Sequence, residues 1–162
     1  MENSSFIAAS AYPDKDIHGC GFVARLTGTT TEFLTMWLVM CLGREPFKLD
    51  ARGKPYFEPA PAIPCWLFTE KKTSSSFYAD GGKQAVSFPK NTFAFCLFGR
   101  TLVVYHNSKR ANTFGKGGVK PKTIRLEKAG QLVLRFDSGR VPAPHSYKIR
   151  DGFYDRIDIE LF

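Results

Sequence analysis

Two polar segments of the chain carry side chains of the types that bind nucleic acids. Residues 71–83 read KKTSSSFYADGGK, and residues 106–122 read HNSKRANTFGKGGVKPK. Lysine and arginine neutralise phosphates, and serine, threonine and asparagine donate hydrogen bonds to phosphate oxygens. In the major groove, lysine or arginine can bind guanine, asparagine or glutamine can bind adenine, and aspartate can accept from cytosine N4. The two segments therefore predict contacts with both the backbone and the base edges of double-stranded DNA.

The candidate DNA-binding residues are the charged, hydroxyl and amide side chains of these segments, with one tyrosine. Asp80 is the sole acidic residue among the eleven basic ones of the stretch from Lys71 to Arg125. We expect it to accept from a cytosine amino group or to orient a lysine. Arg110 is expected to bind guanine, and Lys120 to bind the phosphate backbone. The candidate residues are Lys71, Lys72, Ser75, Tyr78, Asp80, Lys83, Gln84, Asn107, Ser108, Lys109, Arg110, Asn112, Lys116, Lys120 and Lys122.

Positive charge is concentrated in the second part of the chain. The formal net charge is +8, but residues 1–65 carry 6 basic and 7 acidic side chains, whereas residues 66–162 carry 17 basic and 8 acidic side chains. Charge placed on one side of a molecule attracts polyanions. The lysines of a merely soluble surface would be scattered, so this placement favours a nucleic-acid partner.

Two alternative functions remain open at this point. Asp14 after Pro13, with Glu70 and Lys72 much later, matches the loose pattern of a metal-dependent nuclease, in which carboxylates hold Mg²⁺. Aromatic residues inside the basic segments could instead stack on the bases of a single strand. These aromatic residues are Phe77, Tyr78 and Phe114.

The four cysteines lie in apolar surroundings and none forms a C-x-x-C pair, so a zinc site is not expected. We assign no catalytic residue, no metal ligand and no cofactor, and we expect a binding domain rather than an enzyme. The N-terminus lacks the basic start of a signal peptide, and the longest apolar stretch is about half a membrane span. We therefore expect a soluble, cytoplasmic protein without a membrane partner that is monomeric as an isolated domain.

The elements that position the two segments are mainly short strands. Thr31–Leu42 is the one clear helix, with Gly43 as its stop, and its apolar faces predict that it is largely buried. Residues 46–64 hold five prolines and should be extended, and residues 71–82 and 107–122 should be polar loops. Thr92–Phe98 could be either helix or strand. The expected strands are Phe6–Ala11, Gly21–Leu26, Trp66–Thr69, Gln84–Phe88, Arg100–His106, Gln131–Phe136, Tyr147–Arg150 and Arg156–Leu161.

Short strands separated by glycine and proline predict a mostly β fold, either a closed barrel or a sandwich. We expect residues 1–65 to form an N-terminal extension packed on a barrel made by residues 66–162, as one compact unit.

The order of motifs resembles the B3-like DNA-binding pseudobarrel. Residues 85–90 read AVSFPK, where plant B3 domains have a strand ending in Ile-Pro-Lys, and residues 105–110 read YHNSKR, where those domains have Tyr-Trp-Asn-Ser-Ser-Arg. Residues 126–136 (LEKAGQLVLRF) match their closing leucine, glycine and apolar strand. The resemblance implies a seven-stranded pseudobarrel with one or two short helices.

The sequence is most similar to the effector domain of EcoRII-like type IIE restriction endonucleases. That domain shares a Gly-Gly-x-Gln step, here residues 81–84, and an Asn-Ser-Arg step, here Asn-Ser-Lys-Arg at residues 107–110. The resemblance implies two arms, residues 71–84 and 107–122, that grip the major groove in a sequence-specific way. It also implies the recognition module of a restriction endonuclease in the bacterial cytosol. The second arm lacks the acidic residue of that family, and residues 1–65 have no counterpart in it.

Overall fold

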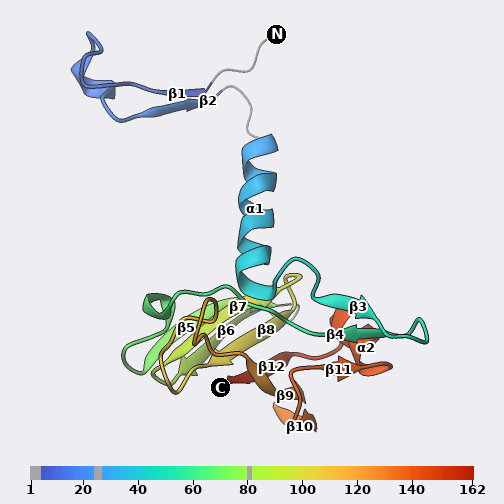
Figure 1. Ribbon diagram of the computed structural model, residues 1–162. Helices are drawn as coiled ribbons and strands as arrows, with labels where there is room; N and C mark the ends of the chain where they lie inside the picture. Colours follow the sequence, from blue (N-terminus) through green and yellow to red (C-terminus); the bar gives the residue numbers. More distant parts are fainter. Residues whose placement is uncertain (1–4, 24–26, 80–81) are drawn as a thin grey trace. The chain divides into compact units, whose positions relative to one another are not determined.

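The structure is a computed structural model that describes residues 5–23, 27–79 and 82–162 (Figure 1). Side chains are described for residues 8–21, 31–77 and 82–162. The chain forms two compact units, Met1–Trp37 and Leu38–Phe162. The boundary between the two units falls after residue 37. Residues 38–65 belong to the larger unit.

The smaller unit contains a short hairpin and most of a helix. Strand β1 (Ser5–Ile7) pairs antiparallel with β2 (Gly21–Val23), and the 3-10 helix η1 (Lys15–Ile17) lies between them in the chain. β1 ends at Ile7, earlier than the predicted Ala11, and residues 24–26 of the predicted second strand lie outside the described residues. Asp14 caps η1, because its carboxylate accepts a hydrogen bond from the Asp16 N–H at 3.0 Å.

Helix α1 (Thr27–Leu42) ends where the sequence predicted but begins earlier, at Thr27 rather than Thr31. Gly43 follows it with φ +87°, and a Cβ atom there would lie 2.9 Å from the Ala60 carbonyl oxygen. Glycine at this position thus ends the helix and also leaves room for the backbone of Ala60. The prediction that α1 is largely buried is wrong for residues 31–42, whose side chains are described: Phe33 is 62% exposed, and of these residues only Cys41 and Leu42 are fully buried.

The main sheet of the larger unit has five strands, in the order β10-β9-β12-β8-β7. β12 lies at its centre, parallel to β8 and antiparallel to β9, and the other pairs are antiparallel. The predicted strands at residues 101–106, 131–136 and 156–161 are confirmed, and the ambiguous residues 92–97 form a strand. The strands are β7 (Thr92–Leu97), β8 (Thr101–His106), β9 (Pro121–Lys128), β10 (Gln131–Phe136) and β12 (Arg156–Leu161).

Two smaller sheets complete the larger unit, and the described strands do not close into a barrel. The proline-rich residues 46–64 are extended as predicted and contribute β3 and β4 to a three-stranded sheet with β11. The prediction of a polar loop at residues 71–82 is wrong, because residues 73–79 form strand β5, which pairs with β6 as a hairpin. These strands are β3 (Phe47–Leu49), β4 (Pro55–Phe57), β5 (Thr73–Ala79), β6 (Gly82–Phe88) and β11 (Val141–Pro142).

Two predicted strands are helical turns instead. Residues 145–150 form helix α2 (His145–Arg150), which follows Pro144 and ends before Gly152 at φ +70°. Residues 65–67 form the 3-10 helix η2 (Cys65–Leu67). No helix in the described parts of the chain has the length and hydropathy needed to cross a bilayer.

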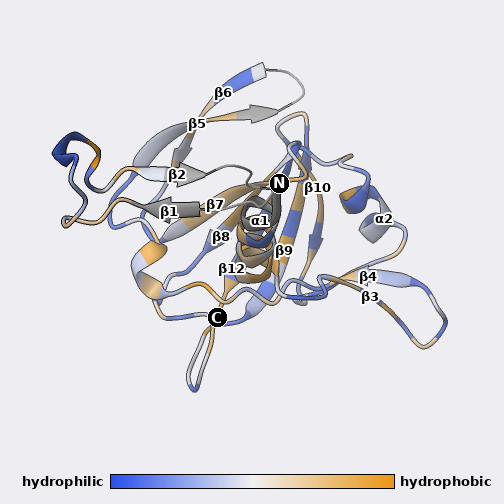
Figure 2. Cartoon of the chain, turned by 90° about the horizontal axis from the view of Figure 1, so that it is seen from above, coloured by the Kyte–Doolittle hydropathy of each residue, from blue (hydrophilic) through white to orange (hydrophobic). Residues whose placement is uncertain are grey.

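The two faces of the main sheet are covered differently. One face carries the main core, in which Ile157 and Ile159 of β12 pack with Ile124 and Leu126 of β9. The buried Tyr105 hydroxyl donates a 2.8 Å hydrogen bond to the Cys41 carbonyl and so ties the end of α1 to β8. The hydrophobic stretches gather on the central strands (Figure 2). On the other face, a second cluster of Phe88, Leu102 and Val104 holds the β5–β6 hairpin against β8.

Candidate nucleic-acid interface

The first arm is a β-hairpin that presents polar side chains to solvent. Phe77 pairs with Gln84 and Tyr78 with Lys83 across the two strands. The candidate residues with described side chains are all exposed: Lys71 and Lys72 directly before β5, Ser75 on β5, and Lys83 and Gln84 on β6. Asp80 lies outside the described residues, as does the side chain of Tyr78.

Phe77 is not free to stack on a base, contrary to the single-strand alternative. It packs with Val86 against the cluster of Phe88, Leu102 and Val104. Its ring therefore fixes the hairpin to the sheet. Of the aromatic residues proposed for stacking, Phe114 in the second arm is 44% exposed.

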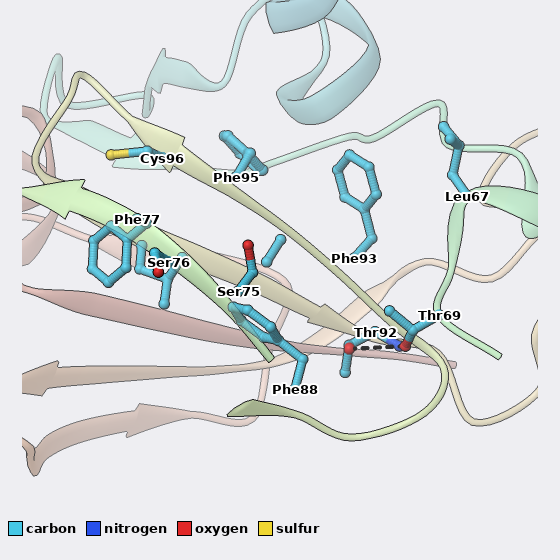
Figure 3. Close-up of a pocket in the computed structure, with 12 residues that line it drawn as sticks. Leu67, Thr69, Ser75, Ser76, Phe77, Phe88, Thr92, Phe93, Phe95 and Cys96 are labelled. Atoms are coloured by element: carbon cyan, nitrogen blue, oxygen red, sulfur yellow. Dashed lines mark hydrogen bonds between the residues drawn. The ribbon is translucent and has the colours of Figure 1, made fainter. Parts of the chain in front are cut away.

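A pocket of about 340 Å³ opens between the hairpin and β7 (Figure 3). The Thr69 N–H donates to the Thr92 carbonyl at 2.9 Å, and the Asn91 N–H donates to the Thr69 carbonyl at 2.7 Å. These bonds join the chain before β5 to the start of β7, but β5 and β7 do not pair further on. Phe77 and Phe88 of the hairpin, and Phe93 and Phe95 of β7, give the pocket apolar walls. The pocket thus lies where the hairpin and β7 of the main sheet separate.

The second arm is a tightly fastened loop rather than a flexible one. Its first residue, Asn107, is 1% exposed, and its amide donates to the Ala111 carbonyl at 2.7 Å and accepts from the Ala111 N–H at 3.3 Å. The Arg110 N–H closes the same turn on the Asn107 carbonyl at 2.9 Å. We therefore correct the expectation for Asn107: its side chain is used within the fold and does not reach a base.

Two neighbouring residues fasten this arm to the proline-rich segment. The side-chain Oδ1 of Asn112 accepts from the Cys65 N–H at 2.8 Å, so the side-chain NH₂ is the group of Asn112 that could bind a ligand. Thr113 is fully buried, and its hydroxyl accepts from the Ile63 N–H and donates to the Pro61 carbonyl, both at 2.7 Å. Sequence reasoning missed Thr113, since a threonine in a polar loop gives no sign of a partner fifty residues away.

Three cations of the second arm have partners within the protein. Arg110 donates to the Glu70 carboxylate at 2.9 Å and to the Phe68 carbonyl at 3.4 Å. Lys120 donates to the Thr113 carbonyl at 2.9 Å, and the Lys122 ammonium lies 4.9 Å from the centre of the Phe162 ring. To bind DNA, these three side chains must either contact it while keeping these partners or break the contacts with them.

The remaining arm lysines have no counter-ion among the described residues. They are exposed, whereas carboxylates elsewhere in the larger unit are paired with other cations, such as Glu58 with Lys48 and Asp155 with Lys128. Positive charge is thus left uncompensated on the arms, where it attracts a polyanion. These lysines are Lys71, Lys72, Lys83, Lys109 and Lys116, and Ser108 is exposed beside Lys109.

A buried ion pair lies where β8 and β12 run side by side. His106 Nε2 is 2.5 Å from Asp158 Oδ1, and the Arg156 Nε donates to Asp158 Oδ2 at 2.6 Å. Burial raises the pKa of Asp158, but the hydrogen bonds from His106 and Arg156 outweigh it and lower the pKa to about 2. His106 therefore serves as a structural partner at the end of the sheet.

The carboxylates named in the nuclease alternative have partners within their own units. Glu70 is paired with Arg110 in the larger unit, and Asp14 caps η1 in the smaller unit. No group of three or more histidine, cysteine or acidic side chains is placed to hold a metal ion within the described residues.

One exposed aromatic residue beside the arms was not predicted. Trp66 lies on η2 and is 72% exposed, although the sequence suggested a strand there. Its position directly after proline-rich residues was the only available signal.

No protein-family model matches the chain, and no curated protein matches it in sequence.

Proposed function

We propose that this chain binds double-stranded DNA sequence-specifically, through the β5–β6 hairpin and the loop at residues 107–122. The observation that carries this proposal is the set of exposed lysines on both arms that have no counter-ion among the described side chains. Lysines of this kind neutralise phosphates and release counter-ions on binding. Gln84 and Ser75, exposed on the same hairpin, add groups that can contact base edges.

The proposed fold is an open relative of the B3-like pseudobarrel. This proposal is supported by the five strands of the main sheet and the two strands of the hairpin packed on one of its faces. The resemblance then suggests the recognition or effector module of a restriction endonuclease, without a catalytic centre of its own.

The first experiment compares two triple variants with the same change of charge. Lys71, Lys72 and Lys83 are replaced by glutamate in one variant. Arg44, Arg52 and Lys54, which are exposed outside the arms, are replaced by glutamate in the control. Binding to a labelled duplex, chosen by selection from random sequences, is followed by fluorescence anisotropy. We expect the arm variant to lose affinity by more than about a hundred-fold and the control by a few-fold, because each phosphate contact adds separately to affinity.

Equal losses in the two variants would mean that net charge, and not the arms, drives binding. Recognition of the DNA sequence is tested by measuring how Arg110→Ala and Lys120→Ala bind matched and mismatched duplexes. We expect Arg110→Ala to weaken binding to the matched duplex by about 1–3 kcal/mol, and Lys120→Ala to weaken all duplexes alike. An unchanged ratio of matched to mismatched affinity in both variants would show a nonspecific DNA clamp.

A further inference from the structure

Trp66 is the most exposed of the large apolar side chains in the described parts of the chain. Its exposed fraction is 72%, whereas the adjacent Phe68 is buried at 1%. A large indole left in water is unfavourable, since burying such a side chain is a main source of stability in cores and interfaces. Exposed tyrosine and tryptophan are enriched at binding surfaces, so we ask what lies around this indole.

The backbone that carries this indole is held on both sides. Before Trp66, the Cys65 N–H donates to Asn112 and the Ile63 N–H donates to Thr113. After it, the Leu67 N–H donates to the Pro64 carbonyl at 3.1 Å, and Phe68 packs into the main core. The indole is thus presented on a fixed turn, and ordering it against a ligand costs little conformational entropy.

The same turn lies where the two arms meet the body of the larger unit. Arg110 of the second arm reaches the Phe68 carbonyl and the Glu70 carboxylate, and Lys71 and Lys72 of the first arm follow directly in the chain. The turn that carries Trp66 therefore lies close to Arg110 of the second arm and a few residues before the lysines of the first arm. An aromatic ring among phosphate-binding cations is the arrangement by which proteins stack on nucleobases.

We propose that Trp66 stacks on an unpaired nucleobase of the bound DNA, an inference that rests on the proposed function. The bases of an undistorted duplex are stacked on each other, so the indole reaches a base face only where a step is opened or kinked, or in a single strand. Both sources offer the same chemistry, a flat aromatic face beside a phosphate. Phe114 gives the second arm another exposed ring for a neighbouring base.

The experiment uses tryptophan emission, because the chain has only two tryptophans. In the Trp37→Phe variant, Trp66 is the only remaining tryptophan. The full chain is titrated with the selected duplex, the same duplex carrying one unpaired base, and a single strand, while DNA anisotropy reports binding independently. We expect the emission of Trp66 to be quenched in step with binding, most strongly by the DNA with an unpaired base.

Substitutions then measure the energetic contribution of the ring. Trp66→Ala should weaken binding to the preferred DNA by about ten-fold or more, whereas Trp66→Phe should recover most of the affinity because a smaller ring still stacks. Leu132→Ala, which removes another exposed apolar side chain, is the matched control and should leave affinity unchanged. Circular dichroism checks that each variant keeps its fold.

The outcomes separate the two proposals. Binding in the anisotropy signal, with unquenched Trp66 emission and full affinity of Trp66→Ala, overturns the stacking role and leaves the proposed function standing. A lack of binding to any of the three DNAs overturns both. A preference for the duplex with an unpaired base identifies an opened step as the source. A preference for the single strand keeps the stacking role and overturns the proposed binding to double-stranded DNA.

Discussion

Asn107 shows how a residue type that suits base recognition can be required by the fold instead. Its amide closes the turn at residues 107–111 by hydrogen bonding to both backbone groups of Ala111. A buried polar group is stable only when such partners are present. The Asn-Ser step that resembles a DNA-contact motif therefore has a structural role in its first residue and an exposed hydroxyl in its second.

We expect Asn107→Ala to lower the free energy of unfolding by about 1–3 kcal/mol, because the backbone groups of Ala111 lose their partner. Ser108→Ala, at the adjacent exposed position, should leave stability unchanged. Urea denaturation of the three proteins measures the difference. Equal midpoints for Asn107→Ala and the parent protein would contradict the structural role of this residue.

The lowered pKa of Asp158 predicts that the folded chain loses stability in acid. Its pKa in the folded chain is about 2, lowered from 3.8, so the unfolded state binds a proton more readily. The stabilisation is thus complete above about pH 4 and is lost as the pH falls towards 2. Comparing the acid unfolding of the parent protein with that of Asp158→Asn isolates this residue. We expect the variant to be less stable at neutral pH and to show a weaker dependence on pH between about 4 and 2. Parallel curves over that window would refute the assignment.

At the scale of elements, alternation of residues predicted the central strands but not their neighbours. Residues 156–161 (RIDIEL) alternate strictly between apolar and charged side chains, and both isoleucines are buried in the core. Tyr147–Arg150 was expected to be a strand, yet these residues form the second part of the six-residue helix α2, which follows Pro144. The serine-rich residues 73–79 had no apolar alternation, and they form a strand because residues 82–88 pair with them.

A buried hydroxyl helps to hold the end of α1. Tyr105 is fully buried, and removing its hydroxyl leaves the Cys41 carbonyl without this partner. We expect Tyr105→Phe to destabilise the chain by about 0.5–1.5 kcal/mol. Amide hydrogen exchange should also speed up in the last turn of α1 and at residues 43–62, while exchange in β9 and β12 is altered less. Uniform changes across the unit would mean that the hydroxyl does not act locally.

At the scale of the whole molecule, the charge pattern could be predicted from the sequence, but its local pairing could not. The sequence placed the basic residues in the second part of the chain, and the exposed lysines of both arms lie there. It could not show that Arg110 is paired with Glu70, or that Trp66 is exposed beside them. Such contacts arise between residues that the fold brings together, and no local pattern encodes them.

The uncompensated lysines also predict how affinity responds to salt. If about five of them bind phosphates, the logarithm of the affinity should fall with the logarithm of the salt concentration at a slope near −4.5. Replacing Lys71, Lys72 and Lys83 should reduce that slope by roughly half, since each lost phosphate contact removes about 0.9. Titrations between low and physiological salt give the slopes, and a slope near zero would remove the electrostatic basis of the proposal.

The central position of β12 has a consequence for how the molecule is made. β12 is the last of the described strands to be synthesised, yet it pairs with both β8 and β9. Until residues 156–161 leave the ribosome, those two strands have facing edges without a partner. Strand pairing over such separations is slow, and exposed edges invite association between chains. The larger unit therefore completes its sheet only after synthesis has reached this strand, and a nascent chain that stalls earlier presents two open edges to its neighbours.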